Sequence, residues 1–141
     1  MCCDPGAPAA AQTVLVPMAG VAGSLQADQH ALLTQTRYRR SREGPTICRE
    51  LSGRPVFSFR DFERGALEWT YLGGQPDPDV NGALRAVLSA MYRSPAAAGV
   101  RWERGLLVII DNTYFFHGRT AGSASTTAAT RHLKRLRILS E

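Results

Sequence analysis

Several features that mark common classes of protein are missing from this sequence of 141 residues. Its apolar runs are much shorter than the roughly 18 residues that a membrane-spanning helix needs, so we expect no contact with a membrane. No basic segment followed by an apolar one stands at the N-terminus, so the sequence predicts no signal peptide. Cys2, Cys3 and Cys48 lack the spacing of a metal site, and their odd number predicts reduced thiols in a cytoplasmic protein.

Lysine is almost absent as well. Lys134 stands against sixteen arginines, and the formal net charge is +5. Such a charge raises the question of a nucleic-acid partner, but the arginines are scattered along the chain. The one cluster, between Arg37 and Arg42, contains a single aromatic residue, Tyr38. We therefore expect solvated surface charge and no nucleic acid, and keep a small basic binding protein as a third hypothesis.

The chain length suits one domain with a modest core. Residues 1–11 contain two prolines and a glycine, which predicts a loop. The apolar run Thr13–Met18 predicts a strand. A helix is expected over residues 25–36, where Leu25, Leu32 and Leu33 share one face and Ser24 precedes them as a cap.

A second helix is expected near residues 78–94. Asp77 is a suitable N-cap residue, Pro78 suits the first helical position, and Pro95 follows the expected end. Apolar residues recur at helical spacing in between: Val80, Leu84, Val87, Leu88 and Met91. This segment is the more strongly amphipathic of the two expected helices.

Strands are expected to dominate the C-terminal part. Leu106–Ile110 is short, apolar and rich in β-branched residues, which predicts a buried strand, and Tyr114–His117 predicts another after a tight Asp-Asn turn. Residues 131–139 alternate and predict a final strand. With strands at both ends and a helix between them, the sequence predicts a mainly β protein with a helical insert, of the α+β class.

His117 is the first candidate for chemistry. It lies at the end of an expected strand, behind Phe115 and Phe116, and a glycine follows it. Arg119 and Arg131 could supply paired N–H donors to a carboxylate. A neutral imidazole close to a guanidinium suits a metal site that also holds an anion, although a histidine in this position is often structural.

The surrounding motifs carry a resemblance. The sequence runs Ile110-Asp111-Asn112, then His117-Gly118-Arg119-Thr120, then Arg131 fourteen positions after the histidine. This order resembles the C-terminal part of the clavaminate synthase and taurine dioxygenase (TauD/TfdA-like) superfamily of iron(II)/2-oxoglutarate oxygenases. The resemblance implies a partial double-stranded β-helix, or jelly roll, that lacks its N-terminal portion. Residues 1–141 would form one partial domain, with residues 12–141 as the C-terminal portion of that fold.

The resemblance also implies roles for single residues. His117 matches the distal histidine that binds Fe(II), and Arg131 matches the arginine that pairs with the cosubstrate 2-oxoglutarate. Arg135 would contact the cosubstrate or the substrate. Thr13, in a segment similar to a family strand, would also contact 2-oxoglutarate. Asp61 would contact the substrate, although an ordinary loop aspartate is the alternative.

One required motif is missing. The family needs His-x-Asp or His-x-Glu for two of its three iron ligands, and neither occurs in these 141 residues. The resemblance therefore implies a dioxygenase of the hydroxylase type, acting on an amino acid or related small molecule, that needs a second chain for its missing ligands. The alternative is a truncated, non-catalytic remnant. We do not expect the chain to be active alone.

Overall fold

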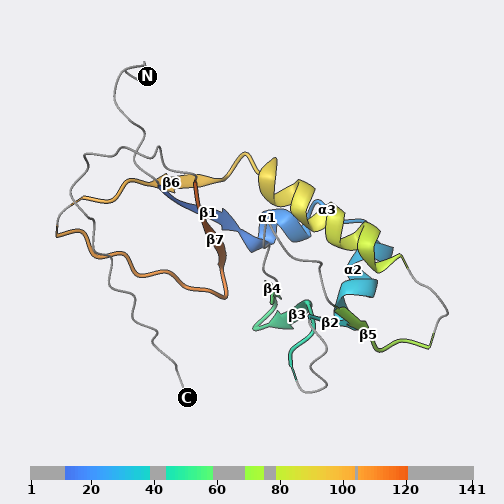
Figure 1. Cartoon of the computed structure of the whole chain (residues 1–141). Coiled ribbons are helices and arrows are strands. Elements are labelled where there is room, and N and C mark those ends of the chain that lie inside the picture. The colour runs from blue at the N-terminus through green and yellow to red at the C-terminus, as the bar shows by residue number, and fades with distance from the viewer. Residues whose placement is uncertain (1–11, 39–43, 59–68, 75–78, 104, 121–141) are drawn as a thin grey trace.

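The computed structural model describes residues 12–38, 44–58, 69–74, 79–103 and 105–120. These residues form short antiparallel sheets and three helices (Figure 1). In chain order the elements are β1 (Thr13–Pro17), α1 (Met18–Ala22), α2 (Ala27–Thr34), β2 (Thr36–Tyr38), β3 (Cys48–Leu51), β4 (Arg54–Phe57), β5 (Trp69–Tyr71), α3 (Val80–Tyr92), β6 (Ala98–Val100) and β7 (Phe115–Arg119).

Strand β1 is the centre of the largest sheet in the described part of the chain. The strand order is β6-β1-β7, and both neighbours run antiparallel to β1. The pairing with β7 extends from Thr13 opposite Arg119 to Pro17 opposite Phe115. Side chains point alternately to the two faces of a sheet along each strand. Val16 and Phe116 lie directly opposite each other and point into the core, where they are 7% and 6% exposed. The β2-β5 and β3-β4 pairs complete the antiparallel structure.

Helix α3 follows its sequence pattern. Its buried residues recur at helical spacing: Val80, Ala83, Leu84 and Val87. Asp79 caps the first turn, since its Oδ1 accepts a hydrogen bond from the Gly82 N–H at 2.7 Å. The buried stripe packs α3 against α2 and α1. Burial of each large apolar side chain is worth about 1.5–3 kcal/mol, so this stripe is the main reason for the position of the helix.

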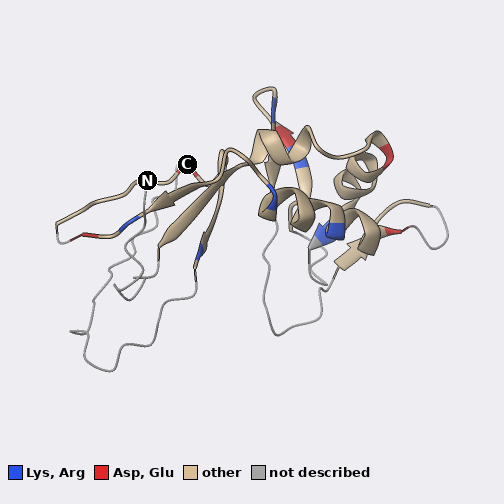
Figure 2. Cartoon of the chain, turned by 90° about the horizontal axis from the view of Figure 1, so that it is seen from above, with Lys and Arg blue, Asp and Glu red and all other residues tan. Residues whose placement is uncertain are grey.

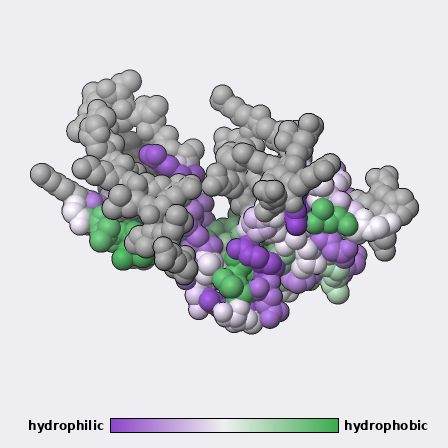
Figure 3. All heavy atoms as spheres, turned by 90° about the horizontal axis from the view of Figure 1, so that it is seen from below, coloured by the Kyte–Doolittle hydropathy of each residue, from purple (hydrophilic) through white to green (hydrophobic). Residues whose placement is uncertain are grey.

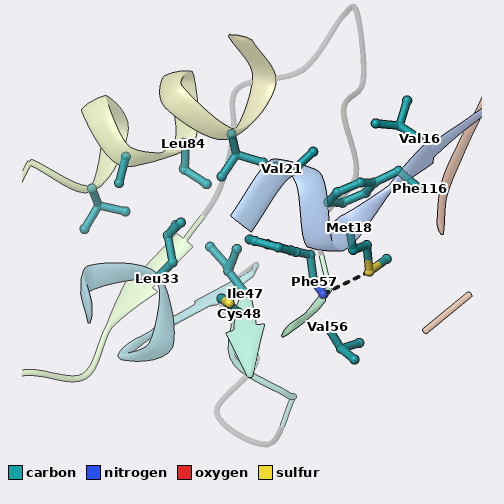
Figure 4. Packing of buried hydrophobic residues seen from close by; sticks show 13 residues of the cluster. Val16, Met18, Val21, Leu33, Ile47, Cys48, Val56, Phe57, Leu84 and Phe116 are labelled. Atoms are coloured by element: carbon teal, nitrogen blue, oxygen red, sulfur yellow. Dashed lines mark hydrogen bonds between the residues drawn. The ribbon is translucent and has the colours of Figure 1, made fainter. Parts of the chain in front are cut away.

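The core joins the helices to the central sheet (Figure 4). The rings of Phe57 in β4 and Phe116 in β7 lie 5.4 Å apart. The Phe57 N–H donates to the Met18 sulfur at 3.3 Å, which ties β4 to the start of α1. Val21 and Leu84 are almost completely buried in the same cluster. One face of the β1-β7 pair therefore packs against the core, and the opposite face does not.

The helix expected over residues 25–36 is shorter than predicted. Helix α2 begins at Ala27, and its cap is Gln26, which exchanges capping hydrogen bonds with Gln29. Ser24 is not the cap, because its hydroxyl donates to the carbonyl oxygen of Gly20. The helix ends at Thr34, and the buried Thr36 starts β2. The second expected helix is confirmed, but Asp79 is its cap, and Asp77 lies outside the described residues.

The prediction of a buried strand at Leu106–Ile110 is wrong. No strand is formed there, and the side chains of Leu107 and Ile109 are 80% and 79% exposed. An apolar run becomes a buried strand only where a neighbouring strand completes its ladder and another layer covers its side chains. Within residues 105–120 and the other described ranges, no strand pairs with this run.

The described residues form a small mixed structure of helices and antiparallel sheets, and the predicted partial jelly roll is not confirmed. The three described sheets do not form a closed jelly roll, and the expected strand at residues 131–139 lies outside the described ranges. Among the helices described, none has the length and apolar character needed to cross a bilayer.

The buried thiol of Cys48 predicts that the fold loses stability at alkaline pH. Its thiol is fully buried, 3.4 Å from Nε2 of His30, and burial raises the pKa of Cys48 to about 11. In the unfolded chain the thiol ionises near its ordinary pKa of 9.0, so the unfolded state is favoured progressively as pH rises from 9 to 11.

We therefore expect the free energy of unfolding to fall over this pH range, and to fall less steeply in Cys48→Ala. Urea denaturation at a series of pH values measures both slopes, with Cys2→Ser as the matched thiol control. Equal slopes for the natural chain and Cys48→Ala would show that the buried thiol has no such effect.

Candidate active site

The register of β1 and β7 brings two predicted site residues onto one face. Directly opposite residues of an antiparallel pair point to the same side of the sheet. Thr13 lies opposite Arg119, and Leu15 lies opposite His117 in the next pair on that face. Thr13 and His117 are thus diagonal neighbours, and residues in such positions lie about 7–8 Å apart in typical sheets. Val16 and Phe116 occupy the opposite, core-facing side, and His117 itself is exposed.

Thr13 is held in place by Trp102. The indole Nε1–H donates to the Thr13 hydroxyl oxygen at 2.7 Å. A threonine hydroxyl has one proton and two acceptor positions, so a hydroxyl that accepts this bond keeps its own proton to donate. Thr13 can therefore donate to an anionic oxygen bound over this face, and its contact with 2-oxoglutarate stays a prediction.

The last residue of the His-Gly-Arg-Thr motif has a structural role. The Thr120 hydroxyl accepts from the Gln12 N–H at 2.9 Å, and the Thr120 N–H donates to the Gln12 carbonyl oxygen at 3.0 Å. These two bonds extend the ladder by one step beyond Thr13 and Arg119. They fix the end of β7 and with it the register that places His117.

The Asp-Asn motif forms the turn that leads into β7. Oδ1 of Asp111 accepts the Thr113 N–H and the Thr113 hydroxyl, both at 2.7 Å. These bonds hold the pKa of the Asp111 carboxyl below its usual value. Asp111 therefore serves β7 as a turn residue.

The described residues do not fit a complete iron site of the two-histidine-one-carboxylate type. No group of three histidine, cysteine, aspartate or glutamate side chains lies close enough to hold a metal within the ranges the structure describes. His30 lies on α2 beside Cys48. His117 therefore offers one ligand only. Asp61, Arg131 and Arg135 lie outside the described residues, so their roles stay predictions.

Among the residues that the structure describes, the arginines are not concentrated on one surface (Figure 2). Described arginines lie on separate elements: Arg37 on β2, Arg49 on β3, Arg54 on β4, Arg85 on α3 and Arg119 on β7. A nucleic-acid interface needs basic side chains gathered along one face. The described charges do not favour such an interface.

Comparison with known proteins now decides the family. The sequence model described as "Taurine catabolism dioxygenase TauD, TfdA family" matches residues 1–137, nearly the whole chain. The chain belongs to the TauD/TfdA family. This confirms the resemblance carried by the His-Gly-Arg-Thr segment. Neither a curated protein nor a solved structure matches the chain.

Membership of the TauD/TfdA family points to dioxygenase-type chemistry, since its members generally depend on Fe(II) and 2-oxoglutarate. The sequence had indicated His117 and Thr13 but not the contacts that hold them. Trp102 is 89 positions from Thr13 along the chain, so their hydrogen bond left no local signal. The structural role of Thr120 likewise left no local signal, because its partner Gln12 is 108 positions away.

The bond between Trp102 and Thr13 can be tested by paired substitutions. Thr13→Val removes the acceptor and leaves the partly buried indole N–H of Trp102 without a partner. Thr13→Ser keeps the hydroxyl. We expect Thr13→Val to lower the free energy of unfolding by about 1 kcal/mol more than Thr13→Ser does. Urea denaturation measures the difference. If both variants are equally stable, the bond does not anchor β1.

Proposed function

We propose that this chain provides part of the active site of an Fe(II)- and 2-oxoglutarate-dependent dioxygenase of the hydroxylase type. The reaction couples decarboxylation of 2-oxoglutarate to hydroxylation of a C–H group, on an amino acid or a related small molecule. His117 is one iron ligand, and Thr13 donates a hydrogen bond to the cosubstrate. Arg131 and Arg135 are proposed to bind the carboxylates, and Asp61 to contact the substrate.

The observation that carries this proposal is the shared face of Thr13 and His117. Residues 104 positions apart in sequence, each matched independently to the family, come to diagonal positions on one pair of strands. Arg119, directly opposite Thr13, adds a guanidinium to the same face. An imidazole, a hydroxyl donor and a cation on one surface suit a bound metal with an anionic ligand beside it.

The remaining iron ligands are proposed to come from polypeptide outside these 141 residues. His-x-Asp and His-x-Glu are absent from the sequence, and a single imidazole holds Fe(II) weakly because affinity depends on several ligands fixed together. The exposed apolar run at Leu107 and Ile109 supports an outside partner. Large exposed apolar surface is typical of a surface that another polypeptide covers.

A non-catalytic member of the TauD/TfdA family is the second candidate. It is favoured by the same missing motif, because one ligand cannot support the reaction. Such a chain would keep the fold of the β1-β7 pair without binding iron and 2-oxoglutarate together. The two candidates therefore differ in one measurable property, which is the formation of a ternary complex.

The test is an anaerobic titration of Fe(II) and 2-oxoglutarate, followed by the visible metal-to-ligand charge-transfer band. The chain is titrated alone and together with the polypeptide encoded immediately upstream. We expect the band only in the mixture, and we expect His117→Ala to abolish it, because the substitution removes a ligand.

His30→Ala is the matched control, since His30 lies on α2 beside Cys48 and not on the β1-β7 face. It should leave the band unchanged. A mixture without the band would favour the non-catalytic candidate. A band that survives His117→Ala would exclude His117 as a ligand.

A further inference from the structure

Trp102 follows β6, the strand that pairs with β1 on the side opposite β7 (Figure 1). Val100, the last residue of β6, lies directly opposite Thr13. The chain continues for two more residues to Trp102, whose indole reaches the Thr13 side chain, with 2.7 Å from Nε1 to the hydroxyl oxygen. The indole therefore adjoins Thr13 on the face of the sheet that also carries His117.

The position of the Thr13 hydroxyl is closely restricted. Its backbone is held from both sides, because Thr13 pairs with Val100 of β6 and with Arg119 of β7. Its β-branched side chain has few rotamers. The remaining freedom is the rotation of the hydroxyl proton about the C–O bond. The hydrogen bond from Trp102 restricts this rotation, because it takes one acceptor position of the oxygen and directs the proton away from the indole.

The direction of this proton matters for an anion bound over the same face. The indole N–H, the Thr13 O–H and a carboxylate oxygen would form a chain of hydrogen bonds, and hydrogen bonds in such a chain polarise one another. An indole nitrogen donates and cannot accept, so the chain runs in one direction only. Its last member gains most, since a hydrogen bond to a charged group contributes more than one between neutral groups.

The second of the two tryptophans in the chain provides a comparison. Nε1–H of Trp69, on β5, donates to Oδ1 of Asn81 on α3 at 2.9 Å. This amide oxygen carries no proton, so the bond ends there and serves to join β5 to α3. The bond of Trp102 differs, because its acceptor is itself a donor.

We propose that Trp102 is a positioning residue for the cosubstrate 2-oxoglutarate. It acts through Thr13, by directing the Thr13 hydroxyl proton toward a carboxylate oxygen of the cosubstrate. This inference rests on the proposed function, because it takes the contact between Thr13 and 2-oxoglutarate from there. It adds a residue that sets the affinity for the cosubstrate without contacting it.

The first measurement uses the natural chain and 2-oxoglutarate as the probe, at constant ionic strength. The two indole N–H resonances are followed by NMR, and Trp69→Phe assigns them. We expect a saturable shift of the Trp102 resonance, because a bound carboxylate polarises the whole chain of hydrogen bonds, and no shift of the Trp69 resonance. Equal shifts of the two resonances, or no saturable shift of the Trp102 resonance, would overturn the proposal.

A double-mutant cycle then shows whether Trp102 acts through Thr13. The affinity for 2-oxoglutarate is measured on the amide resonance of Gly118, which lies in β7 and is kept in every variant. We expect Trp102→Phe to weaken binding about threefold and Thr13→Val about tenfold. In the Thr13→Val background Trp102→Phe should have no further effect, since no hydroxyl proton is left to direct. An equal loss in both backgrounds would show a purely structural role and contradict the proposal.

Two variants serve as controls. Trp69→Phe removes an indole N–H of the same kind on β5 and should leave the affinity unchanged. Thr13→Ser keeps the hydroxyl and should keep both the affinity and its loss on Trp102→Phe. The amide resonances of Val16 and Phe116, which lie opposite each other in β1 and β7, check that the register is kept in each variant.

These measurements need no iron, so this inference and the proposed function can be rejected separately. A charge-transfer band together with unchanged affinity in Trp102→Phe would keep the dioxygenase and reject the positioning role. The expected cycle without a band in the mixture would reject the dioxygenase and keep the positioning role in a chain that binds 2-oxoglutarate alone.

Discussion

The rest of the structure depends on the antiparallel pairing of β1 with β7. This register turns Val16 and Phe116 into the core, where Phe116 packs against Phe57, and turns Thr13 and His117 to the opposite face. A slip of one residue would exchange the two faces and bury the imidazole. The bonds between Gln12 and Thr120 fix one end of the ladder, and the Met18 N–H, which donates to the Tyr114 carbonyl oxygen, fixes the other.

Much of the fold could be predicted from local patterns. The strand at Thr13 and the apolar stripe of α3 follow from spacing and are found. The strand expected at Tyr114–His117 is found at Phe115–Arg119. The errors arise where distant residues decide. The apolar pattern at Leu107 cannot tell whether a neighbouring strand exists. The hydrogen bond from Trp102 to Thr13 joins segments that are far apart in the sequence, so no local pattern predicts it. The burial of Arg54 Nη1 without a hydrogen-bond partner among the described residues likewise depends on distant segments.

This chain has some of the residues expected at the candidate site and lacks others. His117 and the Thr13 hydroxyl share a face, but the sequence offers no His-x-Asp or His-x-Glu. Figure 3 shows several separate groups of apolar side chains on one face of the described part. The side chains of Leu107 and Ile109 are among the exposed large hydrophobic ones. The further polypeptide that we propose would supply the missing ligands and cover the apolar surface.

Paramagnetic broadening by Mn(II) tests most directly whether a metal binds on the face of the β1-β7 pair that carries Thr13 and His117. Mn(II) accepts the same oxygen and imidazole ligands, and broadening detects even weak, rapidly exchanging binding. At substoichiometric Mn(II) with 2-oxoglutarate, the account predicts that the ring protons of His117 and the methyl group of Thr13 broaden first, while those of His30 stay sharp. Broadening that begins at His30, or that is uniform over the chain, would contradict it.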